Sequence, residues 1–375
     1  MLDDDLYRQL QRHLDRMPVP FPATESSVEI RILTRLFSAE EARVVLALGM
    51  IPERAARIRR RLRREMAGER VQAVLDAMAD RGLITRLPGS GDPRYAKAPF
   101  VVGFYEAPVN RLTEPLERDV FQYLDEGFAA ALHSARTPQM RTVPVNRPIP
   151  APDRPVGRYD DIAEFVRTSQ GPFAVMNCIC QQGKDLVSEP CRVTPNREHC
   201  LTFGGAARVV VDRGAARSIS REETLALLER ADRDGLVLQP QNTQHPLFVC
   251  CCCGCCCGIL ATAKKFPRPA DFLATAYHVE TDTTHCQECG ACVGRCQMGA
   301  VSCEAGPATV DLSRCIGCGL CVSTCPSGAM RLVPNEHQTA PPADTAKMYA
   351  QMYRERYGAL GLAAAIGRRV LGLKT

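Results

Sequence analysis

The stretch Cys286-Gln-Glu-Cys289-Gly-Ala-Cys292-Val-Gly-Arg-Cys296 has four cysteines in the spacing C-x2-C-x2-C-x3-C. The same spacing returns 29 residues later in Cys315-Ile-Gly-Cys318-Gly-Leu-Cys321-Val-Ser-Thr-Cys325, which Pro326 follows. The residues between the first three cysteines of each copy include the small residues Gly290, Ala291, Gly317 and Gly319. The two segments form an internal repeat that dictates how this part of the chain folds.

Cysteines at this spacing are typical ligands of a pair of 4Fe–4S clusters. Three thiolates two residues apart can surround one corner of a cubane, while the fourth reaches the neighbouring cluster. Zinc knuckles do not repeat this spacing, so iron is favoured over zinc. We therefore expect a first cluster on Cys286, Cys289, Cys292 and Cys325, and a second cluster on Cys315, Cys318, Cys321 and Cys296.

Eleven further cysteines precede the repeat, and none of them has its spacing. Burial as ordinary apolar residues would explain one or two thiols but not eleven. We expect at least one further cluster on Cys178, Cys180, Cys191 and Cys200. Residues 250–257 contain seven cysteines, which point in different directions and cannot all bind one cubane. The possible ligands among them are Cys250, Cys252, Cys253, Cys255, Cys256 and Cys257.

The composition places these thiols in a reducing compartment. All 20 cysteines of the 375-residue chain lie between Cys178 and Cys325. The N-terminal sequence is acidic and then amphipathic, unlike a secretory signal, and no apolar run reaches the length of a membrane span. We therefore expect a cytoplasmic protein, in which structural disulfides are rare and metal ligation is the better explanation of clustered cysteines. Cys303 is expected to be a spare core thiol.

The chain as a whole is predicted to be α+β and modular. Helices through residues 39–48, from Pro52 and after Gly68, followed by a hairpin over residues 83–100, predict a winged helix-turn-helix. Six prolines in residues 138–155 predict a linker or extended strap. The expected domains are an N-terminal helix and strap (1–27), a winged-helix-like unit (28–105), a helix and Pro-rich connector (106–157), a cysteine-rich middle domain (158–273), a βαββαβ dicluster ferredoxin domain (274–335) and a helical tail (336–375).

Smaller elements follow from capping residues and glycines. Ser38 and Ser220 are each expected to cap a helix, and Gly82 and Gly235 to end one. A short helix is expected over residues 158–169 and strands over 171–177 and 236–239. The C-terminal helical stretch, residues 344–374, is expected to break at Gly358 and Gly361. His199 and His285 each precede a cysteine, but we expect them to be exposed or hydrogen-bonded rather than ligands.

The basic helix after Pro52 raises the possibility of DNA binding, since seven arginines lie within residues 54–64. However, base readout normally falls to the last helix of such a motif. That helix carries Glu69, Asp76 and Asp80, which phosphates would repel. A protein-interaction module is therefore favoured over DNA binding.

The repeat resembles the bacterial two-cluster ferredoxin over about residues 278–334, with Gln297 where proline is usual. A wider resemblance is carried by residues 17–37 (MPVPFPATESSVEIRILTRLF), APFVVGFYE at 98–106, the C-x-C…C…CL-x-FG segment, and NTQHPLFVCCCCGCCC at 242–257. Together these look like a family of bacterial and archaeal multi-cluster 4Fe–4S binding proteins that end in a dicluster ferredoxin domain. In that family asparagine is usual at the position of Cys251, so the resemblance implies that Cys251 is not a ligand. The cysteine blocks also look distantly like the CCG-type clusters of heterodisulfide reductase-like subunits.

These features predict an iron–sulfur protein that relays low-potential electrons to a redox partner protein or an oxidoreductase complex. We expect two 4Fe–4S clusters from the repeat, and three or four in all. One alternative is a reductase, or a subunit of one, with a catalytic cluster at residues 178–257. A second is a redox-sensing winged-helix regulator. No nucleotide-binding motif or small-molecule substrate site is evident, and binding to a membrane surface is not favoured.

The charge balance supports the same expectation. The formal net charge of +5 treats every thiol as neutral. Each 4Fe–4S core with four thiolates would carry a charge of about −2, so bound clusters would bring the chain close to neutrality. This weakens the case for a nucleic-acid partner and leaves the basic helix as a local patch.

Overall fold

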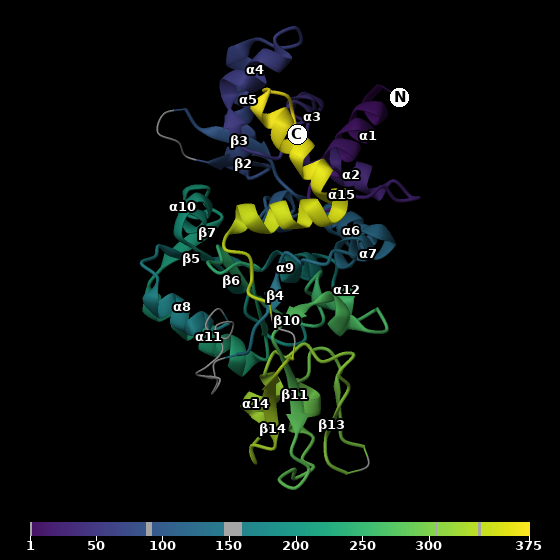
Figure 1. Cartoon of the computed structure of the whole chain (residues 1–375), viewed down its shortest axis with the longest axis vertical. Coiled ribbons are helices and arrows are strands. Elements are labelled where there is room, and N and C mark those ends of the chain that lie inside the picture. The colour runs from purple at the N-terminus through teal and green to yellow at the C-terminus, as the bar shows by residue number, and fades with distance from the viewer. Residues whose placement is uncertain (1, 88–91, 146–159, 305, 337–338) are drawn as a thin grey trace. The chain divides into compact units, whose positions relative to one another are not determined.

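The computed structural model describes the chain except for residues 1, 88–91, 146–159, 305 and 337–338 (Figure 1). The chain forms two compact units, Met1–Ala135 with Tyr349–Thr375, and Arg136–Met348. Both contain helices and strands, which confirms the α+β class. In the described residues, no helix is both long enough and apolar enough to cross a membrane.

The first unit is mainly helical and contains one small sheet. Its sheet has the order β1-β3-β2, and both strand pairs are antiparallel. The helices are α1 (Leu2–Leu14), α2 (Val28–Leu36), α3 (Ala39–Leu46), α4 (Ala55–Leu62), α5 (Gly68–Arg81), α6 (Glu114–Tyr123) and α7 (Ala129–His133), with a π-helical turn at Leu124–Phe128; the strands are β1 (Glu53–Arg54), β2 (Ile84–Leu87) and β3 (Arg94–Lys97).

Local sequence signals explain where several of these helices begin and end. Ser38 and Glu41 form a reciprocal capping box at the start of α3, which satisfies two otherwise unpaired backbone donors. Gly82 ends α5 with φ at 87°, a conformation that glycine adopts without strain. Both predictions are confirmed. The prediction that Pro52 opens the basic helix is wrong by a few residues, because β1 pairs with β3 before α4 begins at Ala55.

A cluster of aromatic side chains forms the core of this unit. Phe21, Phe100, Phe104 and Phe128 are fully buried, and Tyr123 packs among them. Phe100 lies at the centre, with its ring centroid 5.0 Å from that of Phe128 and 5.4 Å from that of Phe21. These edge-on and tilted contacts are the geometry that aromatic rings prefer.

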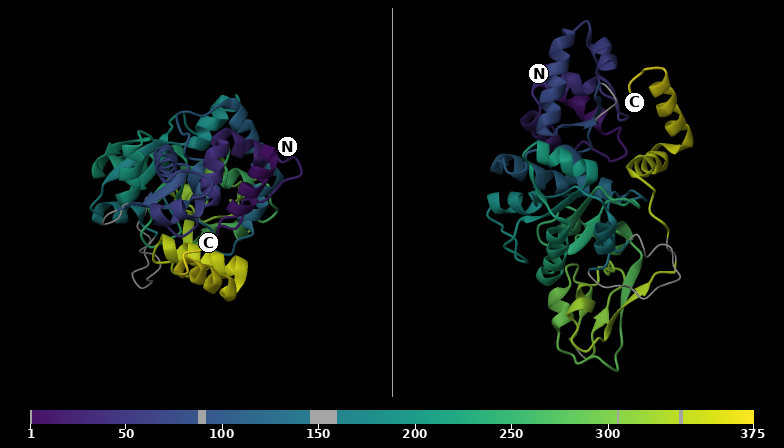
Figure 2. Two further views of the ribbon diagram at one scale, coloured as in Figure 1. Left: turned by 90° about the horizontal axis from the view of Figure 1, so that it is seen from above. Right: turned by 90° about the vertical axis from the view of Figure 1, so that its left-hand side faces the viewer.

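The C-terminal segment binds two arginines of α4. α15 (Thr345–Val370) breaks at Gly358, where φ is 75°, as expected, but it continues through Gly361, so the second expected break is wrong. Arg57 donates to the carbonyl of Arg369 at 3.1 Å, and Arg61 donates to that of Gly372 at 2.9 Å. Arg61 also pairs with the buried carboxylate of Glu53. In Figure 2 this segment is yellow and α4 is dark blue.

The second unit is built on a five-stranded antiparallel sheet in the order β7-β5-β6-β9-β8. A strand at residues 171–177, the helix cap at Ser220, the helix end at Gly235 and a strand after it were all expected and are confirmed. The strands are β5 (Phe173–Asn177), β6 (Glu198–Phe203), β7 (Ala216–Ile219), β8 (Val237–Pro240) and β9 (Phe248–Cys252); the helices are α8 (Ile162–Thr168), α9 (Ile179–Leu186), α10 (Gly204–Asp212), α11 (Arg221–Asp234) and α12 (Leu260–Ala263).

The two faces of this sheet differ in chemistry. One face packs its apolar side chains on α8 and α11, which lie side by side in Figure 1. Phe203 on this face meets Phe165 of α8, with 5.3 Å between the ring centroids. Because side chains alternate along a strand, the residues between these apolar positions face the other way. That second face carries Cys200, Cys250 and Cys252.

The repeat forms a separate set of short elements in the order β11–α13–β12–β13–α14–β14. β11 pairs with β14 and β12 with β13, both antiparallel. The bounds are β11 (Tyr277–Thr281), α13 (Ala291–Arg295), β12 (Val301–Ser302), β13 (Thr309–Val310), α14 (Leu320–Thr324) and β14 (Met330–Pro334). α13 and α14 each follow a glycine in the left-handed conformation, with φ of 70° at Gly290 and 75° at Gly319. The sequence repeat is thus also a repeat of backbone structure.

The segment that contains the prolines contacts both the strand before the repeat and the loop after β8. β4 (Arg141–Thr142) pairs in parallel with β10 (Ala274–Thr275), which follows the 3-10 helix at Pro269–Phe272. The buried guanidinium of Arg141 pairs with Asp160 at 3.0 Å and donates to the carbonyls of Gln241 and Thr243. The rest of the expected strap, residues 146–155, lies outside the described residues.

Candidate metal centres

The first candidate centre is a cavity, partly open to solvent, at the first copy of the repeat. Its lining includes the four cysteines expected for the first cluster, which are Cys286, Cys289, Cys292 and Cys325. Ala308 and Met330 add an apolar wall, and Cys303 also lines the cavity. Cys303 is therefore a neighbour of this centre rather than a distant core thiol.

The second candidate centre is a cavity, partly open to solvent, that is lined by Cys296, Cys315, Cys318 and Cys321. These are the four cysteines expected for the second cluster. Val279, Met298 and Ile316 complete an apolar lining. Burial raises the pKa of Cys318 to about 12, so this thiol ionises readily only when a cation compensates its charge.

Backbone amides point at sulfur atoms in both cavities. The Ala308 N–H donates to Cys286 Sγ at 3.4 Å, and the Ala300 N–H donates to Cys296 Sγ at 3.2 Å. Burial opposes ionisation of Cys325, but hydrogen bonds from the Met330 amide, the Ser327 hydroxyl and the Ala329 amide outweigh it and lower its pKa. Such donors stabilise thiolate ligands and adjust the reduction potential of a bound cluster.

A third group of thiols lies on the second face of the five-stranded sheet and at the start of α9. Cys200 of β6 stands opposite Cys250 of β9, and Cys252 lies two residues further on the same face. Contacts between neighbouring thiols join six cysteines into a continuous row. The order of the row is Cys178, Cys180, Cys257, Cys252, Cys250 and Cys200.

The thiols of this row cannot ionise independently. Hydrogen bonds from Cys178 and Cys257 hold the pKa of Cys180 well below its ordinary value. Hydrogen bonds from Cys200 and Cys252 do the same for Cys250. The pKa of Cys252, between Cys250 and Cys257, is raised well above its ordinary value by those same contacts. All six can be thiolates together only around a positively charged group.

A buried amide faces the row without a partner. Gln239 of β8 stands opposite Cys250, so its side chain lies on the thiol face of the sheet. It is fully buried, and neither its amide nitrogen nor its amide oxygen has a hydrogen-bond partner among the described atoms. Buried amides without partners are costly, so this one fits a site whose occupant offers hydrogen-bonding atoms, as the sulfides of a cluster do.

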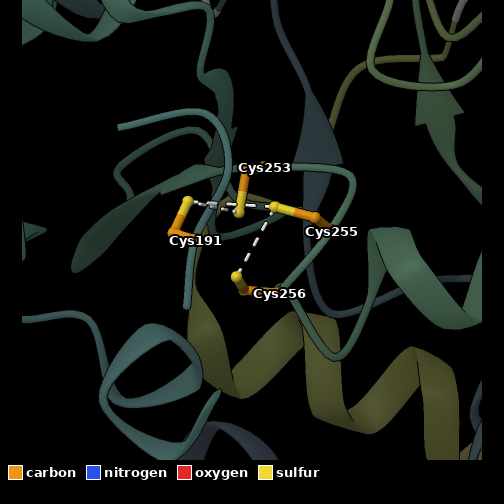
Figure 3. Close-up of side chains that lie close together, drawn as sticks. All are labelled: Cys191, Cys253, Cys255 and Cys256. Carbon is orange, nitrogen blue, oxygen red and sulfur yellow. Dashed lines mark hydrogen bonds between the residues drawn. The ribbon is translucent and has the colours of Figure 1, made fainter. Parts of the chain in front are cut away.

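A fourth group of four thiols lies in direct contact. Cys191 Sγ is 3.7 Å from Cys253 Sγ and 3.8 Å from Cys255 Sγ, and Cys255 Sγ is 3.5 Å from Cys256 Sγ (Figure 3). All four sulfurs lie within 4.8 Å of one another. The structure thus brings Cys191 together with the turn after β9, and not with Cys178, Cys180 and Cys200, with which the sequence grouped it.

Cys251 and His199 stand apart from these groups. Cys251 lies between Cys250 and Cys252 on β9, so it points to the opposite, apolar face, and burial raises its pKa. His199 is buried rather than exposed, and burial lowers its pKa to about 4. His285 is exposed and hydrogen-bonds to Asp282 with 3.0 Å between Nδ1 and Oδ2, as expected.

Three glutamines are part of these sites but were not predicted as such. Gln239 faces the row, and Gln181 Nε2 donates to Cys191 Sγ at 3.1 Å. Gln297 Oε1 accepts a hydrogen bond of 2.8 Å from the Gly254 N–H, in the middle of the dense cysteine block. Of the three, only Gln297 is unusual in the sequence, because it occupies a position at which the resemblance predicts proline.

Comparison with known proteins supports an iron–sulfur chain. Residues 308–331, which contain the second copy of the repeat, match the family described as 4Fe-4S binding domain. No curated protein matches the chain, and no solved structure matches it. The matched family and the cysteine-rich region together indicate 4Fe–4S binding and iron–sulfur electron transfer.

Proposed function

We propose that this chain relays electrons through two ferredoxin-type 4Fe–4S clusters and at least one further cluster in the middle domain. The observation that carries the proposal is the pair of cavities, each lined by the four cysteines that the repeat assigns to one cluster. In such a centre the cluster supplies the redox chemistry when bound. The chain contributes thiolates, an apolar lining and backbone N–H donors, which set potential and exposure.

The row of six thiols supports the further cluster. It offers more than the four ligands that one cubane needs, and Gln239 places a donor and an acceptor beside it. Cys252 and Cys257 are buried, and Cys180 and Cys250 are half-buried. Burial keeps water away from a cluster and is one of the ways in which a protein adjusts the cluster's potential.

Gln297 offers a direct connection between the second cavity and the middle domain. It follows Cys296, which lines that cavity, and its side chain binds the Gly254 N–H. Gly254 in turn lies between Cys253 and Cys255. A methyl group at Gly254 would lie 2.2 Å from the Gln297 carbonyl oxygen, so the two backbones approach closely. We propose that electrons pass between the two cysteine regions near this contact.

Quantifying iron and acid-labile sulfide in anaerobically purified protein tests the proposal. Two ferredoxin-type clusters and one further cubane give about 12 iron per chain, and two further cubanes give about 16. A count of about 8 iron would remove the further cluster and leave only the two ferredoxin-type clusters. Electron paramagnetic resonance of the reduced protein then shows whether the additional iron belongs to a separate paramagnetic centre.

The surplus of thiols in the row favours one alternative, a reductase with a catalytic cluster at residues 178–257. A cluster with unusual ligation could leave a thiol or an iron free for a disulfide or thioester substrate. Adding candidate substrates to the reduced protein distinguishes the two functions. A new paramagnetic signal or turnover would favour the reductase, whereas an unchanged spectrum without turnover would favour the electron carrier.

The first unit is proposed to be a winged-helix-like module that binds protein rather than DNA. The order α3–β1–α4–α5–β2–β3 is typical of a winged helix, and β1 adds the third strand that many such units have. Two arginines of α4 already bind carbonyls of the C-terminal segment, so fewer are free to contact phosphates. A gel shift at physiological salt in both cluster-loaded and apo forms would overturn this assignment.

A further inference from the structure

The four sulfurs of Cys191, Cys253, Cys255 and Cys256 converge on one point. Cys191 comes from the loop before β6, and the other three come from the turn that follows β9. Figure 3 shows the four side chains directed at a common centre from different sides. The sulfur–sulfur distances of 3.5, 3.7 and 3.8 Å leave no room between the thiols for a second metal atom.

These distances match the geometry of a single ion. Four thiolates at 2.3 Å from one tetrahedral ion lie about 3.8 Å from one another. The thiolates of a cubane each bind a different iron, so their sulfurs stand further apart than those that share one ion. The cysteines of the ferredoxin-like repeat instead line two separate cavities. The same chain thus contains two kinds of cysteine site.

Hydrogen-bond donors contact the sulfurs of this site, and such donors stabilise thiolates. Gln181 is 1% exposed, and its Nε2 donates to Cys191 Sγ at 3.1 Å and approaches Cys253 Sγ at 3.8 Å. The amides of Thr194 and Val193, just after Cys191, also hydrogen-bond to the Cys191 sulfur. A buried N–H donor stabilises a sulfur atom mainly when that sulfur carries negative charge.

We propose that Cys191, Cys253, Cys255 and Cys256 bind one divalent metal ion in a closed tetrahedral site. A set of four thiolates with no open position is typical of structural zinc, and a single iron is the other ion that such a set takes. The ion ties the loop after α9 to the turn after β9, and so fixes the segments that also supply the six-thiol row. This inference does not depend on the proposed electron transfer.

Metal analysis of the full chain with one cysteine replaced tests the site. Cys255→Ser removes one ligand from the half-buried part of the site. We expect the protein, purified anaerobically from medium that contains both zinc and iron, to lose about one zinc per chain and no iron. Cys251→Ser is the matched control, because Cys251 belongs to the same block but faces away, and it should retain both metals.

The outcomes separate this site from the iron–sulfur clusters. Loss of one iron instead of one zinc supports the single-ion site and identifies its ion as iron. Loss of about four iron from Cys255→Ser, or no loss of any metal, would overturn the proposal. Should the variant not fold, X-ray absorption at the zinc edge of the unmodified protein replaces it. Four sulfur neighbours at about 2.3 Å support the site. A zinc shell with other ligands overturns it, and so does the absence of zinc together with an iron count of about 8, 12 or 16 per chain, which clusters alone would explain.

Discussion

The ferredoxin-like repeat and the middle sheet both collect cysteines, but they do so in different ways. In the repeat, cysteines two or three residues apart surround open cavities, and each set comes almost entirely from one short segment. In the middle sheet, thiols from loops, strands and a helix up to about 80 residues apart touch one another directly. The first arrangement depends on local spacing, and the second depends on the register of a sheet.

This difference has a physical consequence for how robust each site is. The lining of the second cavity contains four cysteines and no fifth, so a cluster bound there would lose a ligand that no other thiol in the lining replaces. A row of six thiols contains more ligands than one cubane uses, so it can tolerate a loss. The following changes test that contrast in order of decreasing effect.

Cys321→Ser is expected to have the largest effect. Cys321 is buried in the second cavity, which has no fifth cysteine in its lining. The variant should lose about four iron per chain and one of the low-potential paramagnetic centres. Iron analysis and electron paramagnetic resonance measure both. Retention of all the iron would show that this cavity does not bind a cluster through Cys321.

Cys252→Ser should remove less iron than Cys321→Ser. Cys252 lies in the middle of the row, where Cys250 and Cys257 flank it on either side. With five thiols remaining, the row should keep at least half of its iron, about two or more atoms per chain, although the spectrum of that centre should change. Complete loss of the further cluster would mean that the row has no spare ligand, and the contrast with the cavities would then fail.

Gly317→Ala should destabilise the repeat without removing a ligand. Gly317 has φ of 62°, and a methyl group there would lie 2.1 Å from the Tyr277 carbonyl oxygen. The left-handed conformation and the clash together should lower the free energy of unfolding by about 3 kcal/mol. Thermal unfolding of the holoprotein measures it. Gly294→Ala, which meets nothing within 4 Å, is the control and should change stability by less than about 1 kcal/mol.

Gln297→Met is expected to have the smallest effect, because it removes one hydrogen bond between the two cysteine regions. The Gly254 N–H would lose its acceptor, which should cost about 1 kcal/mol, and the metal content should not change. Denaturant unfolding followed at the cluster absorption gives the value. Gln170→Met, at an exposed position of the same unit, should leave stability unchanged. Equal stabilities of the two variants would argue that the Gln297 contact contributes nothing.

The sequence was informative where a site is local and uninformative where it is assembled by packing. The repeat motif assigns four cysteines to each cavity, because a fixed spacing in a short loop leaves little freedom. Cys191 was grouped with Cys178 and Cys200 because they are near in sequence. Its place beside Cys253 depends on the pairing of β6 with β9, which no local pattern reveals. Gln181 and Gln239 were missed for the same reason, since a glutamine in a helix or strand has no distinctive signature.

The alternation of side chains along β9 also limits how this chain can change over evolutionary time. Cys250 and Cys252 face one side, Cys251 faces the other, and the turn that begins at Cys253 leads to the contacting thiols. Insertion or deletion of a single residue within β9 would turn Cys251 toward the row and move its neighbours into the apolar layer. Because the row has more thiols than one cubane needs, it could tolerate many point substitutions. Insertion or deletion of one residue would instead disrupt the row and displace the turn at the same time. We therefore expect related sequences to vary in residue identity within residues 248–257 while keeping the length of this segment constant.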